Sequence, residues 1–297
     1  MNSSTSSSRT HAVAFALTLV MGVASFLAGS EFLVRKAALS DSYEAYRARF
    51  RAAGSTRVAI GDSRTAAAIA GPELENLGLP GDDLQVVLDK LKARHSLKPL
   101  SHVVLQADPH QFAIYRLLKD SSGKLDDLVG PAPVLSFLRP YYRQYLMAYW
   151  HAAFVRQFGG RVEADENAAI DLRDPGGSQW RELAASRVQF HLPLENPDAT
   201  RVAKAYKATI RSLLADGVKV CLATYPVSTA YREASGRYAS FAGAIEFYNR
   251  AAEETGATRA NFWSALRDDD FGDTDHLSHH AAAAFTALLW KQCFEAN

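Results

Sequence analysis

The chain has 297 residues, which is enough for one large domain or two small ones around a sizeable core. Hydrophobic residues make up 48% of the chain and charged residues 22%, a composition typical of globular rather than disordered proteins. The 33 Lys and Arg residues balance the 32 Asp and Glu residues, so the charge gives no reason to expect nucleic acid as a partner.

The N-terminal segment is apolar enough to enter a membrane. Residues 12–30 contain no charged side chain, and about 20 apolar residues are needed to cross a bilayer as a helix. A cleaved signal peptide is the alternative, but its apolar core usually has only ~7–15 residues. Residues 1–36 are therefore predicted to be a membrane anchor or signal sequence, with an anchor favoured, and residues 37–297 to form the main domain.

Beyond the anchor, short apolar runs alternate with segments of helical periodicity. Such alternation indicates an α/β fold with a central parallel sheet of about five strands and helices on both faces. Ligands of parallel sheets bind at the carboxyl ends of the strands. In chain order, we expect a polar helix over 31–54, a strand over 57–60, a helical turn over 64–71, a strand over 74–79, a helix over 82–95, a strand over 103–105, a helix over 201–216, a strand over 218–225, a helix over 241–255, a strand over 257–263 and a helix from 279 to about 294.

Residues 120–200 interrupt this alternation and are predicted to be an insertion, largely helical with a long loop. The insertion holds an aromatic run from Tyr141 to Trp150. Aromatic residues at helical spacing favour core packing, and a sugar-stacking platform is the alternative.

The two cysteines, Cys221 and Cys293, form no Cys-x-x-Cys motif, which disfavours a structural zinc site or a thioredoxin-like centre. Cys221 lies in an apolar run and is predicted to be a core residue. A disulfide between the two is open in an oxidising compartment, but it needs a geometry that the sequence does not supply. We therefore expect two unpaired cysteines.

A serine follows the first predicted strand, in Gly61-Asp62-Ser63-Arg64. A serine hydroxyl becomes a good nucleophile when a base takes its proton. A turn at the end of a strand exposes the hydroxyl and directs the N–H groups of the next helix toward a developing oxyanion. An ordinary helix N-cap is the alternative, because Asp and Ser are both favoured there.

A second polar constellation lies near the C-terminus, where Asp273 precedes His276 by three residues. This spacing lets one loop supply both a base and the carboxylate that orients it. Ser278 is predicted to cap the following helix, while His279 and His280 are expected to face solvent. A solvated polar loop is one alternative. A metal site is another, with four candidate ligands: Asp273, Asp275, His276 and His280.

These blocks resemble the SGNH (GDSL-like) hydrolase/acyltransferase superfamily. Residues 61–64 are similar to its first block, residues 273–278 to its last, and residues 76–81 to its second, whose glycine gives an N–H to the oxyanion hole. The resemblance covers about 55–110 and 200–295. It implies a flavodoxin-like three-layer sandwich.

The resemblance also implies the roles of individual residues, without any metal or cofactor. Ser63 is expected to be the nucleophile and His276 the base, oriented by Asp273. The backbone N–H groups of Ser63 and Gly81 are expected to form the oxyanion hole.

The third block departs from the family pattern, in which a G-x-N-D block supplies an Asn donor to the oxyanion. Here the strand end reads Gln106-Ala107-Asp108-Pro109-His110-Gln111, without an Asn. A carboxylate at Asp108 would repel an oxyanion unless it is protonated or turned away, so His110 or Gln111 is the candidate donor. Asp108, His110 and Arg64 are also candidate substrate contacts, with a surface salt bridge as the alternative for Arg64.

The resemblance implies serine-dependent acyl transfer on a cell-envelope or extracellular glycopolymer, as an O-acetyl esterase or an O-acyltransferase. The expected partners are an acylated polysaccharide or small acyl ester and, by analogy with anchored relatives in alginate or cellulose acetylation and teichoic-acid alanylation, a membrane-bound O-acyltransferase. The expected location is the cell inner membrane, single-pass through residues 12–30, with the main domain in the periplasm or outside the cell. The alternative is a non-catalytic, membrane-anchored accessory or polysaccharide-binding protein with the same fold.

Overall fold

The computed structural model of the chain describes residues 5–36, 39–119, 123–131, 135–139, 141–142, 146, 150, 154, 157 and 177–295. The chain divides into two compact units. One consists of Met1–Ala48 and Gly130–Glu163, and the other of Arg49–Val129 and Ala164–Asn297.

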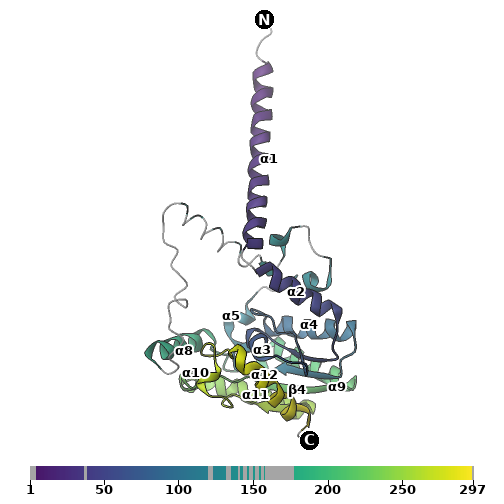
Figure 1. Cartoon of the computed structure of the whole chain (residues 1–297), viewed down its shortest axis with the longest axis vertical. Helices are drawn as coiled ribbons and strands as arrows, with labels where there is room; N and C mark the ends of the chain where they lie inside the picture. The colour runs from purple at the N-terminus through teal and green to yellow at the C-terminus, as the bar shows by residue number, and fades with distance from the viewer. Residues whose placement is uncertain are drawn as a thin grey trace. The chain divides into compact units, whose positions relative to one another are not determined.

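The N-terminal unit contains one long helix, α1 (Thr5–Lys36), drawn in purple in Figure 1. Its stretch His11–Arg35 is long and apolar enough to cross a membrane, and it is the one such helix in the described part of the chain. Its large apolar side chains, such as Phe15 and Met21, are exposed. An exposed apolar surface of this length suits a lipid environment.

Aromatic residues of the insertion pack within this same unit. Tyr141 is buried and stacks on Tyr43 of α2 (Leu39–Ala52), with 4.2 Å between ring centroids. Trp150 stacks on Phe26 of α1 at 5.3 Å. Core packing is therefore confirmed for Tyr141, whereas Trp150 is only partly buried and its partner Phe26 is exposed. Two further tyrosines of the run lie outside the described residues: Tyr145 and Tyr149.

The second unit is built on a five-stranded, all-parallel sheet with the strand order β2-β1-β3-β4-β5. The predicted mixed α/β class and the parallel sheet are confirmed. Ala59 pairs with Val104, and Val104 with Cys221, so the three central strands are in register across the core. The strands are β1 (Arg57–Ile60), β2 (Glu75–Asn76), β3 (His102–Gln106), β4 (Lys219–Thr224) and β5 (Thr258–Asn261).

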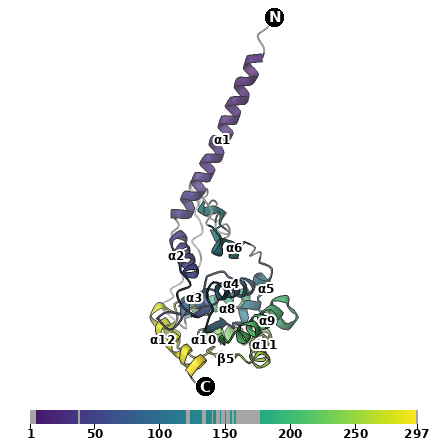
Figure 2. The same ribbon diagram turned by 90° about the vertical axis from the view of Figure 1, so that its right-hand side faces the viewer.

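The helices of this unit form several packed groups, one of which pairs α8 with α10. In a second group α4 contacts α9, and α9 contacts α11; in a third, α3 lies against α12, as both ribbon views show (Figures 1 and 2). The bounds of the helices are α3 (Ser63–Ala68), α4 (Leu84–Leu97), α5 (Ile114–Leu117), α6 (Lys124–Val129), α8 (Ser178–Phe190), α9 (Arg201–Ala215), α10 (Thr229–Ser235), α11 (Ala239–Thr255) and α12 (His279–Trp290), with short turns η1 (Pro109–Phe112), η4 (Pro197–Ala199), η5 (Asp268–Asp270) and η6 (Lys291–Glu295). A further short turn, η2 (Ser136–Leu138), belongs to the N-terminal unit.

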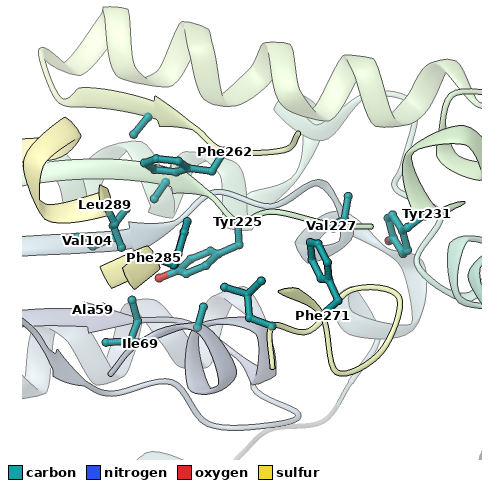
Figure 3. Close-up of a cluster of buried hydrophobic side chains, with 14 of the residues drawn as sticks. Ala59, Ile69, Val104, Tyr225, Val227, Tyr231, Phe262, Phe271, Phe285 and Leu289 are labelled. Carbon is teal, nitrogen blue, oxygen red and sulfur yellow. The ribbon is translucent and has the colours of Figure 1, made fainter. Parts of the chain in front are cut away.

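The core beside α3 and α12 is made from one face of the sheet. Side chains alternate along a strand, so Ala59 and Val104 face the same side and join a buried cluster with helical residues such as Leu289. Figure 3 shows Tyr225 and Phe285 at the centre of this cluster, with 5.8 Å between their rings. This packing fixes the end of β4 relative to α12, and thereby the loop that precedes α12.

Cys221 and Cys293 form a disulfide, so the expectation of two unpaired cysteines is wrong. Cys221 is fully buried in β4, as predicted for a core residue. The C-terminal turn η6 returns to the sheet and brings the two Cα atoms to 5.6 Å, which is within the range of disulfides. A separation of 72 residues gives no sign of this approach in the sequence.

Several elements differ from the expectation. The polar helix predicted over 31–54 is divided between α1 and α2, and α5 was not predicted. The strand predicted over 74–79 is confined to Glu75–Asn76, and the chain then turns toward the carboxyl edge of the sheet. The helix α10 has no counterpart among the expected elements, because its seven residues are too few for a periodic pattern to appear.

Candidate active site

The turn after β1 places Ser63 at the carboxyl edge of the sheet. Gly61 is required there, because a Cβ at this position would lie 2.1 Å from Thr65 Oγ1 and 2.2 Å from Gln106 Oε1. Asp62 caps α3, since its carboxylate accepts a hydrogen bond from the N–H of Arg64 at 2.9 Å. The cap therefore needs Asp62 alone and leaves the hydroxyl of Ser63 free for another partner.

The loop before α12 is held by its own hydrogen bonds. Asp273 Oδ1 accepts from the N–H groups of Asp275 at 3.0 Å and His276 at 2.9 Å. Ser278 occupies the N-cap position, but its hydroxyl donates to the carbonyl of Asp270 at 2.8 Å instead of capping the helix. Ser278 therefore steadies the loop by a different bond from the predicted one.

The structure brings the three predicted triad residues together. The Nε2 atom of His276 lies 2.8 Å from Ser63 Oγ, and its Nδ1 atom lies 2.9 Å from both carboxylate oxygens of Asp273. The carboxylate fixes the proton on Nδ1, so the unprotonated Nε2 atom accepts a hydrogen bond from the hydroxyl of Ser63. The three groups form the hydroxyl–imidazole–carboxylate chain that activates a serine.

Two arginines and a second carboxylate surround this triad. Asp275 Oδ2 accepts from Arg64 Nε at 3.2 Å and Nη2 at 3.0 Å, while Asp275 Oδ1 accepts from Arg187 Nη1 at 2.9 Å. Arg187 also bonds Asp273 Oδ2 at 3.2 Å. The side chain of Arg64 is only 2% exposed, so its ion pair is buried. Arg64 is therefore not a surface residue, and it does not line the pocket that contains Ser63 and His276.

The charge of Asp275 tunes the base. Burial of the His276 ring acts to lower its pKa, but the charge of Asp275 and the hydrogen bond to Asp273 outweigh burial and raise the pKa of His276 above its usual value. Burial acts to raise the pKa of Asp275, yet His276 and Arg64 together hold it far below its usual range. Asp275 is therefore a permanent anion 3.6 Å from His276 Nδ1.

The structure turns Asp108 away from the pocket. Its carboxylate accepts from the N–H of Tyr225 at 2.7 Å and from Gln106 Nε2 at 2.6 Å, and it lies 3.8 Å from Arg64 Nη1. Burial outweighs the nearby Arg64 and raises the pKa of Asp108 to about 6. Asp108 is fully buried, so it neither repels an oxyanion in the pocket nor reaches a substrate.

Ser63 and Gly81 lie at the same pocket. Gly81 has a φ of 79°, a left-handed conformation that favours glycine. No described residue accepts a hydrogen bond from the N–H of Ser63 or of Gly81. Lys119 Nζ donates to the carbonyl of Gly81 at 2.7 Å and steadies this turn. Both N–H groups predicted for the oxyanion hole are therefore free to donate.

The pocket has a volume of about 220 Å³ and contains Ser63, His276, Gly81 and His110 among its lining residues. His110 is thus brought to the site, whereas Asp108 and Arg64 are not. Six lining residues were not predicted from the sequence: Tyr115, Arg116, Lys119, Arg187, Phe190 and His191. They come from the segments 111–119 and 178–191, where no motif signals chemistry.

A metal ion is the alternative for part of this site. The ligand atoms of Asp273, Asp275 and His276 lie within 4.8 Å of one another. The carboxylates are already engaged by two guanidinium groups, however, and the imidazole nitrogens by Asp273 and Ser63. Because their ligand atoms are already paired in this way, the three residues favour an ionic network over a cation site. The side chains of His279 and His280 are exposed, as predicted.

A scan against models of protein families finds no match, and a search of curated proteins finds no significantly similar sequence. The function of the chain is therefore argued from the geometry of its site.

Proposed function

We propose that the protein is a serine-dependent acyl-transfer enzyme of the SGNH type, acting as an O-acetyl esterase or O-acyltransferase on a cell-envelope or extracellular glycopolymer. The observation that carries the proposal is the chain of hydrogen bonds from Ser63 Oγ through His276 to Asp273. A solvated polar loop would have no reason to align these three groups across more than 200 residues of sequence.

The fold supports this assignment. The strand order 2-1-3-4-5 is that of flavodoxin-like, doubly wound sheets. In the proposed three-layer sandwich, α4, α9 and α11 cover one face of the sheet, and α3 and α12 cover the other. The nucleophile turn after β1 then lies at the carboxyl edge, where such sheets bind ligands.

The proposed location is a single-pass anchor in the inner membrane, with the catalytic unit in the periplasm or outside the cell. Two observations support it. The stretch His11–Arg35 is long and apolar enough to span a bilayer. The Cys221–Cys293 disulfide suits an oxidising compartment, because thiols are kept reduced in the cytosol.

In the proposed mechanism, Ser63 Oγ attacks the carbonyl carbon of an ester while its proton passes to His276 Nε2. The tetrahedral oxyanion accepts hydrogen bonds from the N–H groups of Ser63 and Gly81. The intermediate collapses when the leaving alkoxide takes the proton from His276, which leaves an acyl group on Ser63. A water or a sugar hydroxyl then attacks the acyl-enzyme, gives its proton to His276, and releases Ser63 with its proton restored.

The test uses the full chain in detergent, with p-nitrophenyl acetate as substrate and a fluorophosphonate as a serine probe. The wild type should release p-nitrophenol and be labelled at Ser63, whereas Ser63→Ala should do neither. Ser96→Ala removes an exposed serine hydroxyl in α4 and serves as the matched control. A wild type that is not labelled and hydrolyses the ester at the rate of Ser63→Ala would refute the enzyme and favour the non-catalytic accessory protein.

A further inference from the structure

Two cavities meet at the carboxyl edge of the sheet. The catalytic pocket adjoins a second cavity of about 530 Å³, and both are lined by Arg116 and Lys119. The volume of the second cavity falls in the range of small-ligand sites. It opens between the first turns of α4 and α9 and is lined by no residue of the triad. Because Arg116 and Lys119 line both cavities, the second cavity lies beside any group bound in the catalytic pocket.

The turn η1 presents one side chain to each cavity. His110 lines the catalytic pocket, and Gln111 lines the second cavity. Both side chains are at most 1% exposed. Each has one buried polar atom without a hydrogen-bond partner in the described part of the chain, namely His110 Nδ1 and Gln111 Oε1. Buried polar atoms are nearly always paired, so two such atoms in succession point to a ligand that pairs them.

The Nδ1 atom of His110 is a hydrogen-bond acceptor. His110 Nε2 lies 2.6 Å from Asp62 Oδ2, which Arg116 Nη2 also approaches at 2.7 Å. Burial acts to raise the pKa of Asp62, but the charge of Arg116 and the hydrogen bond from His110 keep it well below its usual value, so Asp62 is ionised. An ionised carboxylate requires a proton on Nε2. Burial and the charge of Arg64 lower the pKa of His110 to about 3, so the ring is neutral and Nδ1 carries a lone pair.

The orientation of the Gln111 amide follows from the same carboxylate. Its Nε2 donates to Asp62 Oδ2 at 3.1 Å and to Gln106 Oε1 at 3.1 Å. The reverse orientation would set an amide oxygen against Asp62. Gln111 Oε1 is therefore an acceptor, and neither His110 nor Gln111 can supply the oxyanion donor that the sequence suggested for them.

An aromatic wall borders the same pocket. The rings of Tyr115 and Phe190 stack with 4.0 Å between centroids, and Phe190 is 59% exposed. Two of the three cations that line this pocket pair with carboxylates, Arg116 with Asp62 and Arg187 with Asp273, while Lys119 donates to the carbonyl of Gly81. Hydrogen-bond acceptors beside an exposed aromatic face favour a hydroxyl-rich ligand with apolar C–H faces over a simple anion.

We infer that His110 Nδ1, Gln111 Oε1 and the Tyr115–Phe190 wall form the acyl-acceptor subsite, which binds a carbohydrate through two of its hydroxyl groups. This rests on the proposed function. One hydroxyl of the sugar faces His276, attacks the acyl-enzyme and gives its proton to Nε2. A neighbouring hydroxyl donates to His110 Nδ1, and the adjoining sugar in the second cavity donates to Gln111 Oε1. A monohydric alcohol makes neither of the latter contacts.

The experiment measures acceptor choice by the full chain in detergent. Acetyl transfer from p-nitrophenyl acetate to cellobiose and to ethanol, at equal concentrations, is quantified by mass spectrometry. The wild type should favour cellobiose. His110→Phe keeps a ring of similar size and removes the pocket acceptor, while Asp62 keeps its contacts with Arg116 and Gln111. The cellobiose-to-ethanol ratio should therefore fall roughly tenfold, as expected for one lost hydrogen bond. Labelling of Ser63 by the fluorophosphonate identifies the preparations in which the nucleophile is still reactive, and the ratio is compared among those.

Phe190→Ala is the second variant, because an exposed side chain can be removed without loss of the fold. It should also lower the ratio, whereas Leu97→Ala, which removes an exposed side chain at the far end of α4, should not. A labelled wild type with no preference for cellobiose, or a labelled Phe190→Ala with the wild-type ratio, would overturn the subsite alone. A wild type that is not labelled would overturn the proposed function and the subsite with it.

Discussion

Replacement of Asp275 by Asn tests whether this buried carboxylate sets the basicity of His276. Its Oδ1 atom lies 3.6 Å from His276 Nδ1. A unit charge at that distance is worth about 4.6 kcal/mol at an effective dielectric constant of about 20. Arg64 and Arg187 lie 3.0 and 2.9 Å from the same carboxylate and offset most of its field. We expect the pKa of His276 to fall by about one unit, or ~1.4 kcal/mol.

The assay is the pH dependence of kcat/KM with p-nitrophenyl acetate. His276 acts as a base when it is neutral, so activity rises as pH increases through its pKa. Because this pKa is raised in the wild type, the acidic limb should lie above the usual value for histidine, about 6.5. In Asp275→Asn the limb should move to lower pH by about one unit. Asp269→Asn removes an exposed charge from the same region and should leave the limb in place.

Arg187→Met should shift the acidic limb of the pH profile in the opposite direction. Arg187 is partly exposed and pairs with Asp273 and Asp275. Its removal takes a cation away from the imidazolium and should move the acidic limb to higher pH by a few tenths of a unit. Asp275→Asn also leaves Arg64 short of a partner, so it should lower the stability by about 3–5 kcal/mol. If the limb stays fixed in both folded variants, the electrostatic account of His276 is wrong.

Two further predictions concern the disulfide and the oxyanion turn. The Cys221→Ser, Cys293→Ser double variant should lose about 4 kcal/mol of unfolding free energy, because the disulfide closes a loop with a 72-residue separation; urea titration measures it, and an unchanged midpoint would contradict the disulfide. Gly81→Ala should cost about 1–2 kcal/mol at a φ of 79° and lower kcat by ~10²–10³ if the displaced N–H is an oxyanion donor; full activity would exclude that role.

Much of the triad could be predicted from sequence because each part is local. Ser63 follows a short apolar run bounded by a glycine, which indicates a buried strand, and Asp273 and His276 share one short loop. The contact between these two segments is not local. It follows from the parallel sheet, which sends the ends of its strands to one edge, and from the packing of α3 against α12.

The electrostatic surroundings could not be predicted in this way. Arg64 was expected at the substrate or the surface, and only the fold reveals that its guanidinium turns inward to Asp275. Arg187 comes from α8, within a segment whose sequence carries no motif. Likewise, the direction of Asp108 depends on the N–H of Tyr225, at the end of a strand more than 100 residues away. Such partners are set by tertiary packing rather than by spacing.

The buried charges themselves bear on the choice between an enzyme and a binding protein. Arg64 and Asp275 are at most 2% exposed, and a buried ion pair adds little stability compared with apolar residues of similar size. A protein that only binds a polymer gains nothing from placing such a pair beside an imidazole that is already held by Asp273 and Ser63. An acyl-transfer enzyme does gain, because a fixed anion near His276 stabilises the imidazolium that forms as the serine loses its proton. On the proposed function, the cost of burying these charges is offset in the transition state rather than in the folded ground state.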